Sequence, residues 1–147
     1  MISCTEFIFT YSELFKFLEK KGGKAEVIRF WKYISDTYVQ ESLGEMAQAK
    51  GIEGCYEYWE KTLSEEAADF VMALNDDELT IDMRYCPSKG RLLENPVFDA
   101  YPDYCEHCDL LYRRVLEPLG IEYVVDTSKT DKAQCTTKIL ERSRREV

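Results

Sequence analysis

The residues best suited to chemistry in this chain gather in one short segment, Tyr104-Cys105-Glu106-His107-Cys108-Asp109. It contains two of the six cysteines and the only histidine. Two more cysteines, Cys86 and Cys135, lie in flanking segments that have strand-like patterns. Thiols, imidazoles and carboxylates act as nucleophiles, as proton carriers or as metal ligands. The sequence therefore predicts a thiol-rich functional site.

One interpretation of this segment is a metal site. If residues 100–119 form a regular helix, His107 lies about 100° from Cys108 and about 160° from Cys105 around the helix axis. A single metal ion would then not bind His107 together with both cysteines. Zinc patterns combine two paired half-sites, whereas this chain has one cysteine pair and scattered thiols. We expect either no cofactor or a zinc ion bound by Cys105, Cys108 and Cys135, with His107 exposed to solvent.

A second interpretation is a reactive thiolate. Cys105 falls within the first two turns of the predicted helix, where the helix dipole and free N–H groups favour negative charge. Cys108 would be its inert and buried partner, and Asp109 or His107 would carry a proton. A third interpretation is that these cysteines only pack in a core, where free cysteine is often found.

The composition bounds the function. The chain has 147 residues, of which 45% are hydrophobic and 32% charged, which predicts a soluble globular protein of one domain. A net charge of -9 argues against nucleic acid and anionic membrane surfaces as partners. No apolar run reaches the roughly 18 residues of a membrane helix, and residues 1–10 lack a signal-peptide pattern. We expect a cytoplasmic protein with reduced thiols and a small-molecule partner; homo-oligomer formation is left open.

The elements that position these residues begin with a helical part, residues 1–63. Apolar residues recur there at helical spacing, and glycines interrupt the pattern. Cys55 lies on the last of these helices and is expected to be buried. The periodicity predicts helices over about 6–20, 25–40, 42–50 and 52–62.

From residue 64 the pattern changes to short strands around one long helix. Two apolar-rich runs are separated by four polar residues, as in a β-hairpin, and the second run alternates apolar with polar residues. The order predicts an α+β domain in which a four-stranded, mainly antiparallel sheet follows the N-terminal helices and carries the main helix on one face. The expected segments are strands 68–74 and 79–86, a polar loop 88–95, the main helix 100–119, strands 121–126 and 134–141, and a charged tail 142–147.

Several short motifs of this second half stand out together. A Cys-Pro pair closes a predicted strand, a Tyr-Cys pair starts the main helix, and another cysteine lies on a late strand. They are Cys86-Pro87, Tyr104-Cys105 with Asp109, Leu111, Tyr112 and Leu116 along the helix, and Cys135. This combination, over roughly residues 79–140, resembles the aminothiazoline-carboxylate hydrolase family. Members of that family open a cyclic amidine, 2-aminothiazoline-4-carboxylate, to N-carbamoyl-cysteine.

The resemblance implies a hydrolase that acts on C–N bonds in a cysteine-rich pocket. Cys108 departs from the family pattern, in which an acidic residue is more usual in that region. Ring opening needs a nucleophile, an acid for the departing atom and a cation for the substrate carboxylate. The expected catalytic residues are Cys105, Asp109 and Cys86, and the expected substrate-binding residues are Tyr104, Tyr112, Arg84 and Cys135. The alternative is a non-catalytic, zinc- or thiol-dependent domain that binds or senses a small ligand.

Overall fold

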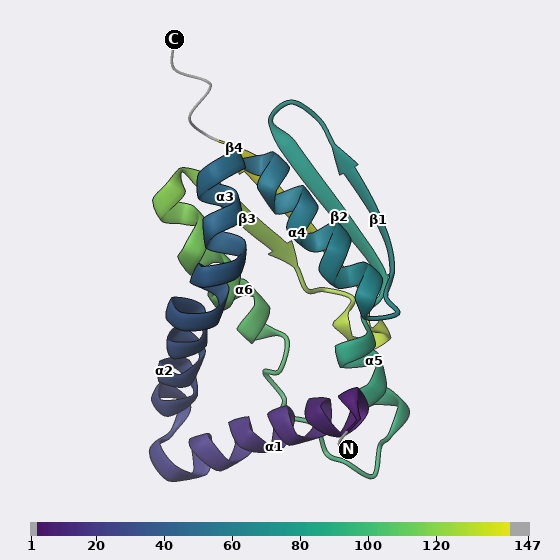
Figure 1. Ribbon diagram of the computed structural model, residues 1–147. Helices are drawn as coiled ribbons and strands as arrows, with labels where there is room; N and C mark the ends of the chain where they lie inside the picture. The colour runs from purple at the N-terminus through teal and green to yellow at the C-terminus, as the bar shows by residue number, and fades with distance from the viewer. Residues whose placement is uncertain (1–2, 142–147) are drawn as a thin grey trace.

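The computed structural model describes residues 3–141 and has its helices first and its sheet second (Figure 1). The N-terminal helices occupy the segments in which helical periodicity predicted them, except that the second predicted helix continues as a π-helix. Their bounds are α1 (Cys4–Gly22), α2 (Lys24–Ile34), the π-helix η1 (Ser35–Gly44), α3 (Glu45–Lys50) and α4 (Ile52–Glu65).

The sheet has four antiparallel strands in the order β1-β2-β4-β3. The hairpin, the main helix and the two late strands follow one another in the predicted order, so the predicted α+β fold is confirmed. The bounds are β1 (Asp69–Leu74), β2 (Glu78–Tyr85), α5 (Pro87–Glu94), α6 (Glu106–Leu116), β3 (Ile121–Asp126) and β4 (Cys135–Glu141), with short 3-10 turns η2 (Glu117–Leu119) and η3 (Thr130–Lys132).

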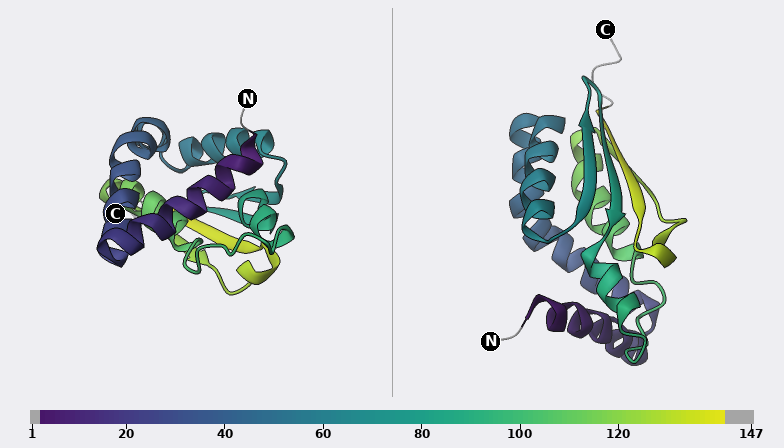
Figure 2. Two further views of the ribbon diagram at one scale, coloured as in Figure 1. Left: turned by 90° about the horizontal axis from the view of Figure 1, so that it is seen from below. Right: turned by 90° about the vertical axis from the view of Figure 1, so that its right-hand side faces the viewer.

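The helices cover one face of the sheet (Figure 2). Alternation along β2 explains this, because Ile81 and Met83 are buried on the helix side while Asp82 and Arg84 are exposed on the other. The two central strands, β2 and β4, hold the register that brings Met83 opposite Cys135. A polar outer face and an apolar inner face therefore place the functional side chains between the sheet and the helices.

Helix α6 is enclosed on two sides. The sheet packs against one side, and α2 and η1 pack against the other. The buried Ser35 hydroxyl, on η1, donates a hydrogen bond of 2.8 Å to the Leu111 carbonyl oxygen. Because two layers cover α6, its buried face is wider than the stripe of a helix that packs on a sheet alone.

Two predicted segments around the site were wrong. The predicted loop 88–95 is instead mostly helix, since α5 covers Pro87–Glu94. The helix begins there because Pro87 takes the first helical position, where its missing N–H loses no hydrogen bond. The main helix begins at Glu106 rather than at residue 100. The preceding turn is held by Lys24, whose ammonium lies 2.5 Å from Asp103 and 2.7 Å from the Glu106 carboxylate.

Across residues 3–141, no helix has the length and apolar character needed to cross a membrane. The predicted charged tail, residues 142–147, lies outside the described residues.

The close crossing of α3 and α4 generates a stability prediction. A Cβ atom at Gly54 would come within 2.1 Å of the Met46 carbonyl oxygen, which is backbone and cannot move aside cheaply. Gly54→Ala should therefore lower the free energy of unfolding by about 2 kcal/mol, although alanine favours helices. The midpoint of urea unfolding measures this. The exposed Lys61→Ala on the same helix should change the free energy of unfolding by less than about 0.5 kcal/mol. Equal effects of the two substitutions would contradict the close approach of α3 and α4 at Gly54.

Candidate functional site

Four of the six thiols line one cavity of about 360 Å³ between α6, the inner face of the sheet and the start of α5. They belong to Cys86, Cys105, Cys108 and Cys135, which are 49 residues apart at the extremes of the sequence and converge only through the fold. The rest of the wall is mainly aromatic and aliphatic. It comprises Ile8, Trp59, Leu63, Glu66, Ile81, Met83, Pro87, Ser88, Lys89, Tyr104, His107, Tyr112, Tyr123, Val125 and Thr137.

Cys86 reaches the cavity because it is the N-cap residue between β2 and α5. Its backbone N–H donates a hydrogen bond of 2.7 Å to the Ala133 carbonyl oxygen, which ties the start of α5 to the start of β4. Burial raises the pKa of its thiol, and hydrogen bonds from the backbone N–H groups of Lys89 and Ser88 oppose that rise. Cys86 is thus the cavity thiol with backbone donors at a helix start.

Cys105 does not have the lowered pKa expected of a thiol near a helix start. Burial and the neighbouring Cys108 raise its pKa to about 11. Burial likewise raises the pKa of both Cys108 and Cys135 to about 12, with Asp109 adding to the rise at Cys108. At neutral pH the cavity therefore holds uncharged thiols, because desolvation outweighs the helix dipole.

Cys108 and His107 form a contacting pair inside this cavity. The Cys108 Sγ lies 3.5 Å from the His107 Nε2, and the His107 Nδ1 contacts the Tyr104 carbonyl oxygen. A carbonyl oxygen can only accept, so Nδ1 must carry the proton of the neutral ring. The unprotonated Nε2 then faces the thiol. A thiol, a base and a group that orients the base is the arrangement of nucleophilic catalysis.

His107 was expected on the surface, and that prediction was wrong. It is only 9% exposed and is surrounded by aromatic rings, with centroids 4.9 Å away at Tyr104 and 5.4 Å away at Tyr11. The prediction failed because α6 buries a second face against the N-terminal helices, where Phe15 and Trp31 also lie close to the imidazole. Burial lowers the pKa of His107 to about 4, so the ring is neutral at physiological pH.

The predicted tyrosines lie in the cavity wall. The Tyr104 hydroxyl is 2.7 Å from the Ser88 hydroxyl, which joins α5 to the turn before α6. Tyr112 packs edge-on against Trp59, with ring centroids 5.3 Å apart. Both therefore give the cavity a rigid aromatic side beside the thiols.

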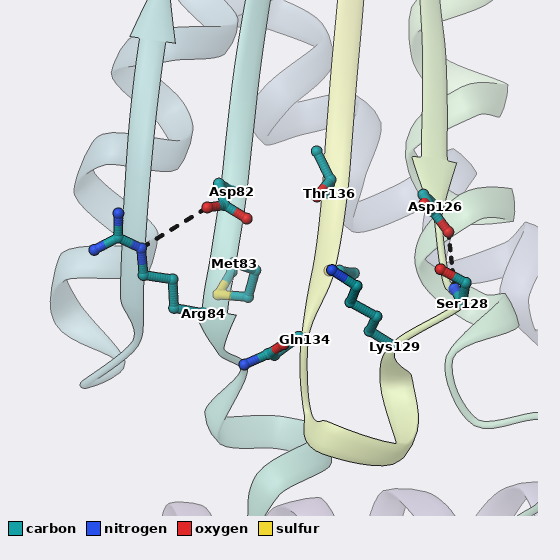
Figure 3. Close-up of a pocket in the computed structure, with 9 residues that line it drawn as sticks. Asp82, Met83, Arg84, Asp126, Ser128, Lys129, Gln134 and Thr136 are labelled. Carbon is teal, nitrogen blue, oxygen red and sulfur yellow. Dashed lines mark hydrogen bonds and ion pairs between the residues drawn. The ribbon is translucent and has the colours of Figure 1, made fainter.

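Asp109 and Arg84, two further predicted site residues, do not line the thiol cavity. The Asp109 carboxylate faces away and accepts a hydrogen bond of 2.5 Å from Arg113. Arg84 lies on the outer face of the sheet, 3.8 Å from the Asp82 carboxylate (Figure 3). The alternation of β2 had already placed Arg84 on the polar face, which points away from the thiols.

The predicted zinc ligands Cys105, Cys108 and Cys135 share this cavity. Among the residues that the structure describes, however, no three histidine, cysteine, aspartate or glutamate side chains are arranged to hold a metal ion. Thiolate ligation would also require the loss of protons that burial holds on these thiols. Zinc binding at these cysteines stays a prediction.

Comparisons of the chain with protein-family models, with curated proteins and with solved structures find no match. The site is therefore interpreted from its own geometry. Sequence reasoning offered His107 as a proton carrier but expected it on the surface, and it missed Ser88 and Lys89 as cavity residues. The signal for the last two was present, because a proline directly after a strand is also a helix start.

The burial of His107 generates a prediction that an NMR titration can test. Because it is the only histidine, its imidazole proton resonances should titrate with a pKa of about 4 in the folded protein. The unfolded chain should titrate near 6.5. Between these values the unfolded state binds the extra proton, so folding stability should fall as pH is lowered.

From pH 7 to pH 4.5 the wild type should lose about 2–3 kcal/mol more stability than His107→Gln. Urea unfolding at both pH values measures the difference. A folded-state pKa near 6.5, or equal losses in the two proteins, would show that the imidazole is accessible to water.

Proposed function

We propose that this protein is a hydrolase-like enzyme that acts on a small cyclic amidine, or a similar C–N substrate, inside the thiol cavity. The observation that supports the proposal is the 3.5 Å contact of Cys108 Sγ with His107 Nε2 in the cavity wall. A nucleophile and a base within reach of each other, beside a space of ligand size, are the parts that such a reaction needs.

In the proposed reaction the Cys108 sulfur bonds to the amidine carbon while its proton passes to His107 Nε2. The imidazolium then gives that proton to the ring atom that departs when its bond to the same carbon breaks. Water attacks the resulting thioimidate, and the Cys108 thiol is regenerated as it leaves. The Tyr104 carbonyl oxygen holds the ring in one tautomer throughout, since it accepts from Nδ1.

The resting pair is neutral, which shapes the proposal. Burial raises the pKa of Cys108 to about 12 and lowers that of His107 to about 4, so a standing thiolate–imidazolium pair is disfavoured. A bound amidinium brings positive charge beside the sulfur and favours the thiolate as the proton leaves. Activation by the substrate itself is a reason to favour a cationic amidine over a neutral amide.

The proposal reassigns two roles from the sequence analysis. Cys108 takes the nucleophile's role in place of Cys105, and His107 carries the proton in place of Asp109. Cys105, Cys86 and Cys135 remain wall residues of the same cavity. The resemblance to the aminothiazoline-carboxylate hydrolases supports 2-aminothiazoline-4-carboxylate as the first substrate to test.

A non-catalytic domain that binds or senses a small ligand is the second candidate. The raised pKa of all four cavity thiols favours it, since buried neutral thiols are usually unreactive. Zinc bound through thiolates would belong to this candidate. The two candidates differ in turnover, and in the metal content of protein purified without chelator.

Turnover of 2-aminothiazoline-4-carboxylate tests the enzyme. With the wild type, the ring-opened product should accumulate in ¹H NMR spectra beyond one equivalent of protein. Cys108→Ala should remove this activity, and His107→Gln should lower kcat by about 10²-fold to 10⁴-fold. The exposed Cys4→Ser should leave kcat unchanged, because Cys4 lies outside the cavity. Undiminished turnover by Cys108→Ala would contradict the assigned nucleophile.

Thiol alkylation separates the same candidates without a substrate. At pH 7 the exposed Cys4 should react with iodoacetamide first, and the fully buried Cys55 last. Addition of acetamidine, a small amidinium, should speed alkylation at Cys108 if bound positive charge promotes the thiolate. No change at Cys108 would favour the binding domain. Mass spectrometry of peptides reports each site.

A further inference from the structure

The cavity wall contains a cation that the proposed reaction does not use. Among the described residues that line the cavity, Lys89 is the one lysine or arginine, and Glu66 is the one aspartate or glutamate. We infer that Lys89 binds the single carboxylate of a small ligand whose body lies against the aromatic wall. This inference shares with the proposed function only the premise that the cavity holds a ligand.

Lys89 is available to a ligand. Within residues 3–141, no carboxylate makes an ion pair with it. The cations elsewhere near α6 are engaged differently: Lys24 binds Asp103 and Glu106, and Arg113 binds Asp109. A half-buried lysine beside an apolar cavity is an unsatisfied charge that an anion would complement.

The charge of the wall selects the class of anion. One lysine can neutralise one negative charge. The thiols and His107 are uncharged, and the exposed Glu66 adds a carboxylate that repels further negative charge. A phosphate dianion would keep an uncompensated charge in surroundings that are chiefly aromatic and aliphatic, at a large desolvation cost. A carboxylate on a small apolar or aromatic body fits the single cation and the volume of about 360 Å³.

The backbone of Lys89 is held firmly in place. It lies in the first turn of α5, where the Gly90 N–H donates a hydrogen bond of 2.8 Å to the Cys86 carbonyl oxygen. Gly90 packs so closely on the Tyr85 ring that a Cβ there would lie 2.5 Å from it. The Tyr85 hydroxyl also donates to Glu94, at 2.6 Å, which fixes the far end of α5. The anchor point of the lysine is thus rigid.

The position of Lys89 predicts how the ligand is oriented in the cavity. Its charge acts on the thiols of Cys86 and Cys105, which lie at the starts of α5 and α6. Trp59, Tyr112 and Tyr123 form a packed aromatic group on another part of the wall, with Trp59 and Tyr123 stacked at 6.2 Å. A carboxylate at Lys89 would place the body of the ligand between this group and the thiols.

A matched pair of non-reacting probes tests the inference by binding alone. Thiazole-4-carboxylate and thiazole-4-carboxamide have nearly the same shape and differ in charge, and neither is a cyclic amidine. Calorimetric titration of the wild type should show the carboxylate binding about tenfold more tightly, as expected for a charged hydrogen bond. Lys89→Met should abolish this preference, and Lys89→Arg should retain most of it.

Glu66→Gln supplies the matched control, since it alters the net charge as much as Lys89→Met does but in the opposite sense. It should keep or increase the preference for the carboxylate. Equal binding of the two probes by the wild type, an unchanged preference in Lys89→Met, or no binding of either probe at millimolar concentration would overturn the inference. Phosphate that competes with the carboxylate at equal concentration would also overturn it. If the wild type prefers the carboxylate probe but does not turn over 2-aminothiazoline-4-carboxylate, the result counts against the proposed reaction alone.

Discussion

The double burial of α6 is the constraint from which the properties of the site follow. The sheet covers one side of this helix and the N-terminal helices cover the other, so His107 is buried and Cys108 half-buried in its first turn. Desolvation disfavours charge, and it therefore holds the thiols protonated and the single imidazole deprotonated. A helix start in water would favour a thiolate. Here the loss of hydration outweighs the helix dipole.

The enclosing layers are held by a few polar contacts rather than by apolar packing alone. Ser35 on the π-helix binds the backbone of α6 at Leu111, and Lys24 at the start of α2 binds Asp103 and Glu106. Each contact joins segments that are more than 70 residues apart in the chain. Such contacts fix where α6 begins, and so they fix which residues of the first turn face the cavity.

The sequence predicted the order of elements well because each strand and helix carries its own local period. The alternation along β2 and the helical spacing of α1 and α4 needed no knowledge of partners. The errors arose where contacts with another element decide the local structure. Pro87 is compatible with both a strand end and a helix start. The structure shows that it starts α5. The approach of Cys86 to Cys135 and Cys108 depends on the same junction, between β2 and α5. His107 was misplaced because a helical wheel does not reveal how many faces of the helix are covered.

A cavity whose thiols and imidazole are uncharged restricts the kind of ligand that can react in it. The thiol cavity presents neutral sulfur, a neutral imidazole, one lysine and the exposed Glu66 carboxylate, so the charge that a reaction needs beside Cys108 must come largely from the ligand. A molecule with a carboxylate at one end and an amidinium at the other would satisfy Lys89 and favour the Cys108 thiolate in a single binding event. Each half would also lower the desolvation cost of the other, since the bound ligand carries no net charge. The same wall would leave the thiols inert while the cavity is empty, which protects four reduced cysteines from adventitious chemistry.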